Sequence, residues 1–103
     1  MKFLYVTFSD NSTWAIPATV IAHDRACYFA RNEEGISTYV SEFKYTMSEA
    51  FEIMDWACNN MNYIDIENDA MPVFGGSPDY FNLYRHEWCN ADKEIKEVEG
   101  VKA

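Results

Sequence analysis

The order of hydrophobic and polar residues predicts an N-terminal β-hairpin that leads into a helix. Residues 2–8 are β-branched and aromatic, a composition typical of a strand. The polar segment 9–12 has turn chemistry, and Asn11 can take a left-handed conformation. Residues 13–16 then predict the returning strand. Pro17 ends that strand and suits the first turn of a helix.

The first predicted helix covers about residues 17–31, and Gly35, after Asn32-Glu33-Glu34, suits its exit. Arg25 falls within its apolar face. Either the Arg25 stem packs there while the guanidinium reaches the edge, or the residue forms a buried ion pair with a carboxylate from the middle of the chain. The predicted apolar face consists of Ala18, Ile21, Ala22, Ala26, Tyr28 and Phe29.

A second helix is predicted from a capping-box pattern, Thr46-Met47-Ser48-Glu49, with Ser48 as a competing cap. The asparagines at positions 59, 60 and 62 are natural terminators of this helix. Residues 36–45, which precede it, are rich in β-formers and predict a short strand or an extended segment. The apolar arc of the second helix comprises Met47, Ala50, Phe51, Met54, Ala57, Cys58 and Met61.

The remaining chain predicts a strand or turn at 63–66, a loop through Pro78, and a closing hairpin formed by 80–89 and 93–98. A last helix is the alternative there, because Ile95 and Val98 are three apart. We therefore expect the α+β class and one globular domain over residues 1–103. Its N-terminal β-hairpin, two helices and C-terminal β-hairpin would form a mixed or antiparallel sheet.

Composition adds an acidic surplus to an ordinary core. Hydrophobic residues make up 49% of the chain and aromatic residues 17%, which is too rich for a disordered chain. The 17 acidic and 8 basic residues give a net charge of −9, which argues against nucleic acid and anionic membranes as direct ligands. Residues 32–79 hold ten acids and one base, Lys44, so the surplus lies in the middle of the chain.

Targeting signals and cysteine usage predict a cytosolic protein. The apolar run at residues 3–8 is shorter than a signal peptide needs, and no stretch approaches the roughly 20 apolar residues of a membrane span. The three cysteines, Cys27, Cys58 and Cys89, are odd in number and widely spaced. This pattern argues against a disulfide framework and for a reducing compartment.

One face of the second predicted helix is the strongest candidate for a binding site. Glu49, Glu52 and Asp55 are spaced three apart outside the apolar arc, and Trp56 falls among them. An exposed Trp flanked by acids would anchor a basic partner. The alternative is a solvated helix face, with Trp56 packed under the loop at 63–79.

Further acids extend this candidate surface. Gathered together, they would steer a basic surface toward the protein, and carboxylates can stand in for phosphates of a nucleic acid. The alternative is charge that serves solubility alone. The added partner-binding candidates are Glu42, Asp65, Glu67 and Asp69, in an acidic stripe that also contains Glu33, Glu34 and Asp79.

Metal and catalytic patterns are weaker. Two pairs, His23 with Cys27 and His86 with Cys89, could close a tetrahedral zinc site if the chain ends meet, although their spacings match no familiar zinc signature. The chain has no Walker, GxSxG, HExxH or Rossmann motif. The chain contains cysteines and histidines that could form a catalytic Cys/His pair, but nothing in the sequence orients such a pair. We therefore expect a non-enzymatic protein with no cofactor, and a small structural or zinc-stabilised protein that uses His23, Cys27, His86 and Cys89 as the alternative.

Two segments resemble those of small phage and prophage proteins: Trp14 to Ala26, and Asp55 to Asn62. With these segments, its small size and its acidic charge, the chain resembles bacteriophage-encoded inhibitors of host defence of the anti-CRISPR type. Those proteins share no common fold, so the resemblance transfers no residues. It implies a mode of action in the host cytoplasm, in which a DNA mimic docks on the basic nucleic-acid groove of a CRISPR-Cas effector and keeps target DNA out.

Overall fold

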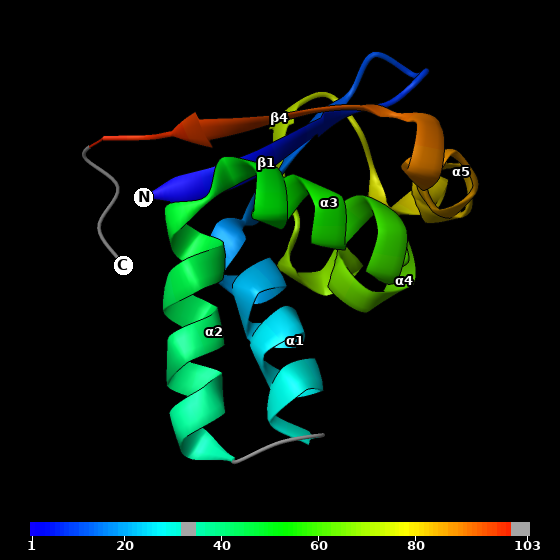
Figure 1. Cartoon of the computed structure of the whole chain (residues 1–103). Coiled ribbons are helices and arrows are strands. Elements are labelled where there is room, and N and C mark those ends of the chain that lie inside the picture. The colour runs from blue at the N-terminus through cyan, green and yellow to red at the C-terminus, as the bar shows by residue number, and fades with distance from the viewer. Residues whose placement is uncertain (32–34, 100–103) are drawn as a thin grey trace.

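A computed structural model describes residues 1–31 and 35–99, and it contains an antiparallel four-stranded sheet in the order β3–β2–β1–β4 with helices packed against it (Figure 1). The predicted α+β class is confirmed. In chain order the elements are β1 (Lys2–Thr7), β2 (Thr13–Pro17), α1 (Ala18–Arg31), α2 (Ile36–Ser48), α3 (Ala50–Asn60), α4 (Tyr63–Ile66), the 3-10 turn η1 (Glu67–Asp69), β3 (Met71–Phe74), η2 (Pro78–Tyr80), α5 (Phe81–Glu87), η3 (Trp88–Asn90) and β4 (Asp92–Glu97).

The N-terminal hairpin has the predicted form. β1 and β2 pair antiparallel, with Leu4 opposite Ile16 and Val6 opposite Trp14. All four side chains are buried, because residues two apart on a strand point to the same face of the sheet. Asn11 in the connecting turn has φ 66°, the left-handed conformation that its side chain tolerates.

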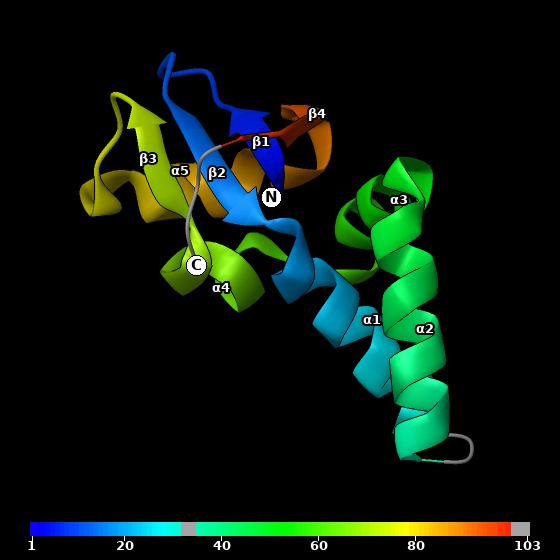
Figure 2. The same cartoon turned by 90° about the vertical axis from the view of Figure 1, so that its left-hand side faces the viewer.

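The core lies between the sheet and the helices, with α1, α3 and α4 on the same side of β1 (Figures 1 and 2). The α1 helix buries the small apolar side chains predicted for its inner face, whereas Tyr28 at its outer end is exposed. The Trp88 indole N–H donates to the carbonyl oxygens of Ala57 and Met61, at 3.2 and 3.0 Å. This contact ties the C-terminal part of the chain to α3. The predicted exit of the first helix at residues 32–34 lies outside the described residues.

The predicted strand at 36–45 is wrong, because this segment belongs to α2. The β-branched and aromatic residues there have only a weak preference for strands, and packing overrides it. Long-range contact with α1 supplies that packing: the Tyr39 hydroxyl bonds His23, and the buried Thr46 hydroxyl accepts from Arg25. As Figure 2 shows, α1 and α2 lie side by side as a pair that extends away from the sheet.

The predicted capping box is also wrong. Thr46 and Ser48 lie in the last turn of α2, where their hydroxyls donate to the carbonyl oxygens of Glu42 and Tyr45. The next helix, α3, starts one residue after Glu49, which makes no side-chain cap bond. A Ser or Thr in a helix can bond a carbonyl one turn back, and this local alternative removes the capping signal.

The buried face of α3 is rotated from the predicted arc. Ile53, which the arc omitted, is fully buried with Ala57, whereas Phe51, which the arc included, is 72% exposed. The apolar residues of this helix are spread over much of its circumference, so periodicity alone did not select the buried side. The contacts of Glu52 and Trp56 with α1, described below, orient the helix instead.

The predicted C-terminal hairpin is wrong, as is the predicted loop through Pro78, which contains strand β3. The segment predicted as its first strand, 80–89, forms α5 and η3, and β4 pairs with β1 instead. The spacing of Phe81, Tyr84 and Trp88 explains the helix, since residues three and four apart share a helix face, and here they reach the core together. Residues 63–66, predicted as a strand or turn, form the short helix α4.

Candidate functional site

Arg25 is the centre of the contacts that hold α1, α2 and α3 together. Its guanidinium donates to Glu42 Oε2 at 2.6 Å and lies 3.8 Å from Glu52 Oε2, and its side chain is only 12% exposed. A second hydrogen bond goes to Thr46 Oγ1 at 3.1 Å. Of the two alternatives for Arg25, the structure has the ion pair with carboxylates from the middle of the chain. Glu42 and Glu52 therefore balance an internal cation.

Trp56 contacts α1. Its indole N–H donates to Asp24 Oδ2 at 2.8 Å, and its ring packs on Tyr28 and Phe29 with centroids 5.5 and 6.0 Å apart. The Arg25 guanidinium lies 5.9 Å from the Trp56 ring centre, a cation–π contact within the protein. The half-buried indole thus has an internal hydrogen-bond partner and an internal cation. The sequence missed Asp24 as this partner, because the two residues are 32 positions apart.

Glu67 is a third acid with an internal partner. Arg85 holds it with two parallel hydrogen bonds, Nε to Oε1 at 2.7 Å and Nη2 to Oε2 at 2.6 Å. The bidentate geometry is the strong form of an arginine–carboxylate contact, and it lowers the pKa of Glu67. Because Glu67 is buried, it contributes little to an external surface.

The other predicted acids lie at the surface, and none has a basic partner among the residues that the structure describes. In the part of the chain that the structure describes, Glu49, Asp55, Asp65 and Asp69 form no ion pair. Asp55 accepts one hydrogen bond from the Asn59 amide at 2.8 Å, and Asp65 accepts the Asn62 backbone N–H at the start of α4. The predicted binding residues therefore fall into two groups: acids that pair with Arg25 or Arg85, and acids that form no ion pair among the described residues.

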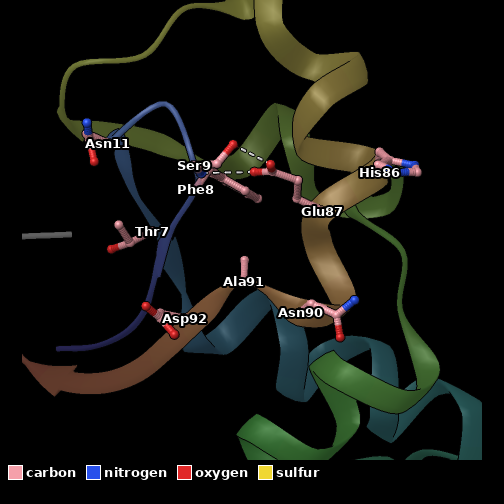
Figure 3. Close-up of a pocket in the computed structure, with 9 residues that line it drawn as sticks. All are labelled: Thr7, Phe8, Ser9, Asn11, His86, Glu87, Asn90, Ala91 and Asp92. Atoms are coloured by element: carbon pink, nitrogen blue, oxygen red, sulfur yellow. Dashed lines mark hydrogen bonds between the residues drawn. The ribbon is translucent and has the colours of Figure 1, made fainter.

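A depression of about 450 Å³ lies between the hairpin turn and the α5–β4 connection (Figure 3). The backbone N–H and the hydroxyl of Ser9 both donate to the Glu87 carboxylate, which lowers the pKa of Glu87. His86 points away from Ser9 in Figure 3, so the group that contacts this hydroxyl is the Glu87 carboxylate and not an imidazole. The lining residues are Thr7, Phe8, Ser9, Asn11, His86, Glu87, Asn90, Ala91 and Asp92.

The four candidate zinc ligands do not assemble. His23 and Cys27 lie on α1, whereas His86 lies on α5 and Cys89 in η3. Among residues 1–31 and 35–99, no three His, Cys, Asp or Glu side chains are grouped so that they could hold a metal ion. Within the same residues, no helix has the length and apolar character needed to cross a membrane.

Comparison of the chain with protein-family models, with curated proteins and with solved structures finds no match.

Proposed function

We propose that the chain is a non-enzymatic inhibitory binding protein of the anti-CRISPR type, which acts in the host cytoplasm. Its acidic surface would dock on the basic nucleic-acid groove of a CRISPR-Cas effector and block DNA binding. The supporting observation is that Glu49, Asp55, Asp65 and Asp69 stay free of ion pairs among the described residues. No Lys or Arg occurs in the sequence between positions 45 and 84, so no basic residue within this segment offsets the negative charge of its acids.

The physical basis is long-range attraction between opposite charges. A patch of carboxylates attracts a groove lined with Lys and Arg, and such electrostatic steering speeds association and weakens in salt. Screening at physiological ionic strength acts over about 8 Å, so only the acids that approach the groove closely contribute to affinity. In this proposal Trp56 and Glu52, which have partners within the protein, stabilise the packing of the helices that present the acidic surface.

The test measures DNA binding by a panel of guide-loaded CRISPR-Cas effectors in a mobility-shift assay with increasing amounts of the chain. We expect at least one effector to lose target DNA, and more chain to be needed at higher salt. The double variant Glu49→Lys/Asp55→Lys should lose the inhibition while remaining folded, because neither carboxylate neutralises an internal cation. Glu52 is left unchanged in this variant, since its reversal would also disturb Arg25.

The matched control reverses two exposed acids on the edge strand β4, Asp92→Lys/Glu94→Lys, and changes the net charge by the same amount. Inhibition retained in this control and lost in the first variant supports a located docking surface. Equal inhibition by both variants and the parent chain would refute docking through Glu49 and Asp55, and inhibition of no effector would refute the proposed class of target.

A further inference from the structure

The Phe51 ring on α3 faces solvent. At 72% it is the most exposed Phe, Tyr or Trp side chain that the structure describes, whereas Ile53 and Ala57 of the same helix are fully buried. In Figure 2, α3 lies at the right-hand edge of the molecule. An exposed aromatic ring gains little from the core of its own protein, so it remains available for contact with a partner.

A carboxylate stands beside this ring. Asp55 follows Phe51 by four residues on α3, and side chains at this spacing are neighbours on a helix surface, with Cβ atoms about 5–6 Å apart. The Asn59 amide donates to Asp55 Oδ1 at 2.8 Å and so restrains the carboxylate. Among the described residues, Asp55 forms no ion pair and its Oδ2 accepts no hydrogen bond. This face of α3 thus carries an exposed aromatic ring next to a positioned anion.

The interior of the protein holds an arginine with the same two kinds of group. The Arg25 guanidinium donates to the Glu42 carboxylate at 2.6 Å, and its central carbon lies 4.7 Å from the centre of the Phe29 ring and 5.3 Å from that of Tyr45. A planar guanidinium can stack on a ring and donate to a carboxylate at the same time, because its N–H groups point outward in its plane. A ring and a carboxylate side by side therefore suit an arginine.

We propose that Phe51 and Asp55 form a surface site for an arginine side chain of the partner, whose guanidinium stacks on the phenyl ring and donates to Asp55 Oδ2. This inference rests on the proposed function and names the side chain that the acidic surface receives. Lysine fits the pair less well, since its ammonium group is strongly hydrated and has no flat face to lay on a ring. Trp56, the anchor predicted from the sequence, already donates to Asp24 and lies against Arg25.

The charge around Phe51 and Asp55 favours an arginine from another protein. Among the described residues, no Lys or Arg of the chain lies over the Phe51 ring. Glu49, which makes no side-chain cap bond at the start of α3, adds negative potential two residues before the ring. Arginine is enriched among the residues that dominate protein interfaces and in sites that bind phosphates. A basic groove that binds nucleic acid therefore presents the side chain that this site fits.

The test uses isothermal titration calorimetry to measure how tightly the chain binds an arginine–glycine peptide and a lysine–glycine peptide of equal length. We expect the parent chain to bind the arginine peptide more tightly. Phe51→Leu keeps an apolar side chain but removes the ring, and Asp55→Asn removes the charge. Each should weaken binding of the arginine peptide about two- to fivefold, the range typical of an exposed cation–π contact or ion pair. Phe74→Leu, the matched control, removes a ring that is 68% exposed on β3 and should leave both affinities unchanged.

Two results would overturn the arginine site: equal affinity of the parent chain for both peptides, or an arginine-peptide affinity that Phe51→Leu leaves unchanged. The titrations contain no CRISPR effector, so they separate this inference from the proposed function. If the parent chain inhibits an effector but shows no preference for arginine, the proposed function stands and the site is wrong. If Phe51→Leu removes a preference for arginine and no effector is inhibited, the site stands and the proposed target is wrong.

Discussion

Gly76 lies at the exit of β3 at a position where no side chain fits. Its φ is +81°, and a β-carbon built there would lie 2.8 Å from both Cζ2 and Nε1 of Trp14. Trp14, on β2, is itself buried against Phe81 and Tyr84 of α5, so it cannot move aside freely. Gly76→Ala therefore combines backbone strain with a steric overlap in the core.

The neighbouring Gly75 separates these two effects. Its φ of +60° imposes similar strain, but the nearest atom to a β-carbon there is Ser12 Cα, at 3.8 Å, an ordinary contact. Left-handed backbone costs a non-glycine residue about 1–2 kcal/mol, offset in part by a gain of about 0.4–1 kcal/mol from the stiffer unfolded chain. We expect Gly75→Ala to cost about 1 kcal/mol, and Gly76→Ala about 2–4 kcal/mol, since overpacking adds about 1–3 kcal/mol.

Urea unfolding followed by circular dichroism measures the difference. With a slope of about 1–3 kcal/mol per molar urea, a further loss of about 2 kcal/mol moves the midpoint of Gly76→Ala roughly 1 M below that of Gly75→Ala. Replacing Trp14 by Phe in the Gly76→Ala chain removes the indole atoms that overlap, so the two substitutions should be less than additive. Equal midpoints for the two glycine variants would refute the overlap with Trp14.

Two other predictions concern the internal ion pairs. Arg25→Met leaves two partly buried carboxylates, Glu42 and Glu52, without their cation and should lower the free energy of unfolding by about 1–3 kcal/mol. Lys44→Met, at an exposed position on α2, should change it by less than about 0.5 kcal/mol; equal losses in urea unfolding would contradict this. Because Arg85 lowers the pKa of Glu67 in the folded state, that pair stabilises the protein above the unfolded-state value of about 4.5, and its contribution disappears as the pH falls through the folded-state pKa. The midpoint temperature of thermal unfolding should therefore fall more steeply between pH 7 and 3 for the parent chain than for Glu67→Gln. Parallel pH profiles of the two chains would contradict the assignment.

Elements with one dominant local signal could be predicted from the sequence. The hairpin of β1 and β2 follows from β-formers around an Asx turn, and α1 follows from Pro17 and a stripe of small apolar residues. The last strand was also predictable as an element, but its pairing with β1 was not, because 90 or more residues separate some of the partners, such as Lys2 and Glu97. Strand pairing over such distances depends on the whole topology.

Segments whose local preference opposed their tertiary environment were mispredicted. Residues 36–45 have side chains typical of strands, yet in the fold they pack as a helix against α1, where Arg25 supplies a cation for Glu42. In the sequence, Thr46 is typical of a helix-capping residue. In the fold its hydroxyl is buried and forms hydrogen bonds with Arg25 and Glu42 instead. In both cases contacts with residues about 20 positions away outweigh propensities of a few tenths of a kcal/mol per residue.

The sequence by itself determined the α+β class, the N-terminal hairpin and the concentration of acidic residues in the middle of the chain, because composition and short-range periodicity express these directly. Only the tertiary structure decided which acids remain available. It assigned Glu42 and Glu52 to Arg25, and Glu67 to Arg85, and it left Glu49 without an ion pair among the described residues. Charge can be counted along a chain, but its neutralisation depends on distances of a few ångströms between residues that meet only after folding.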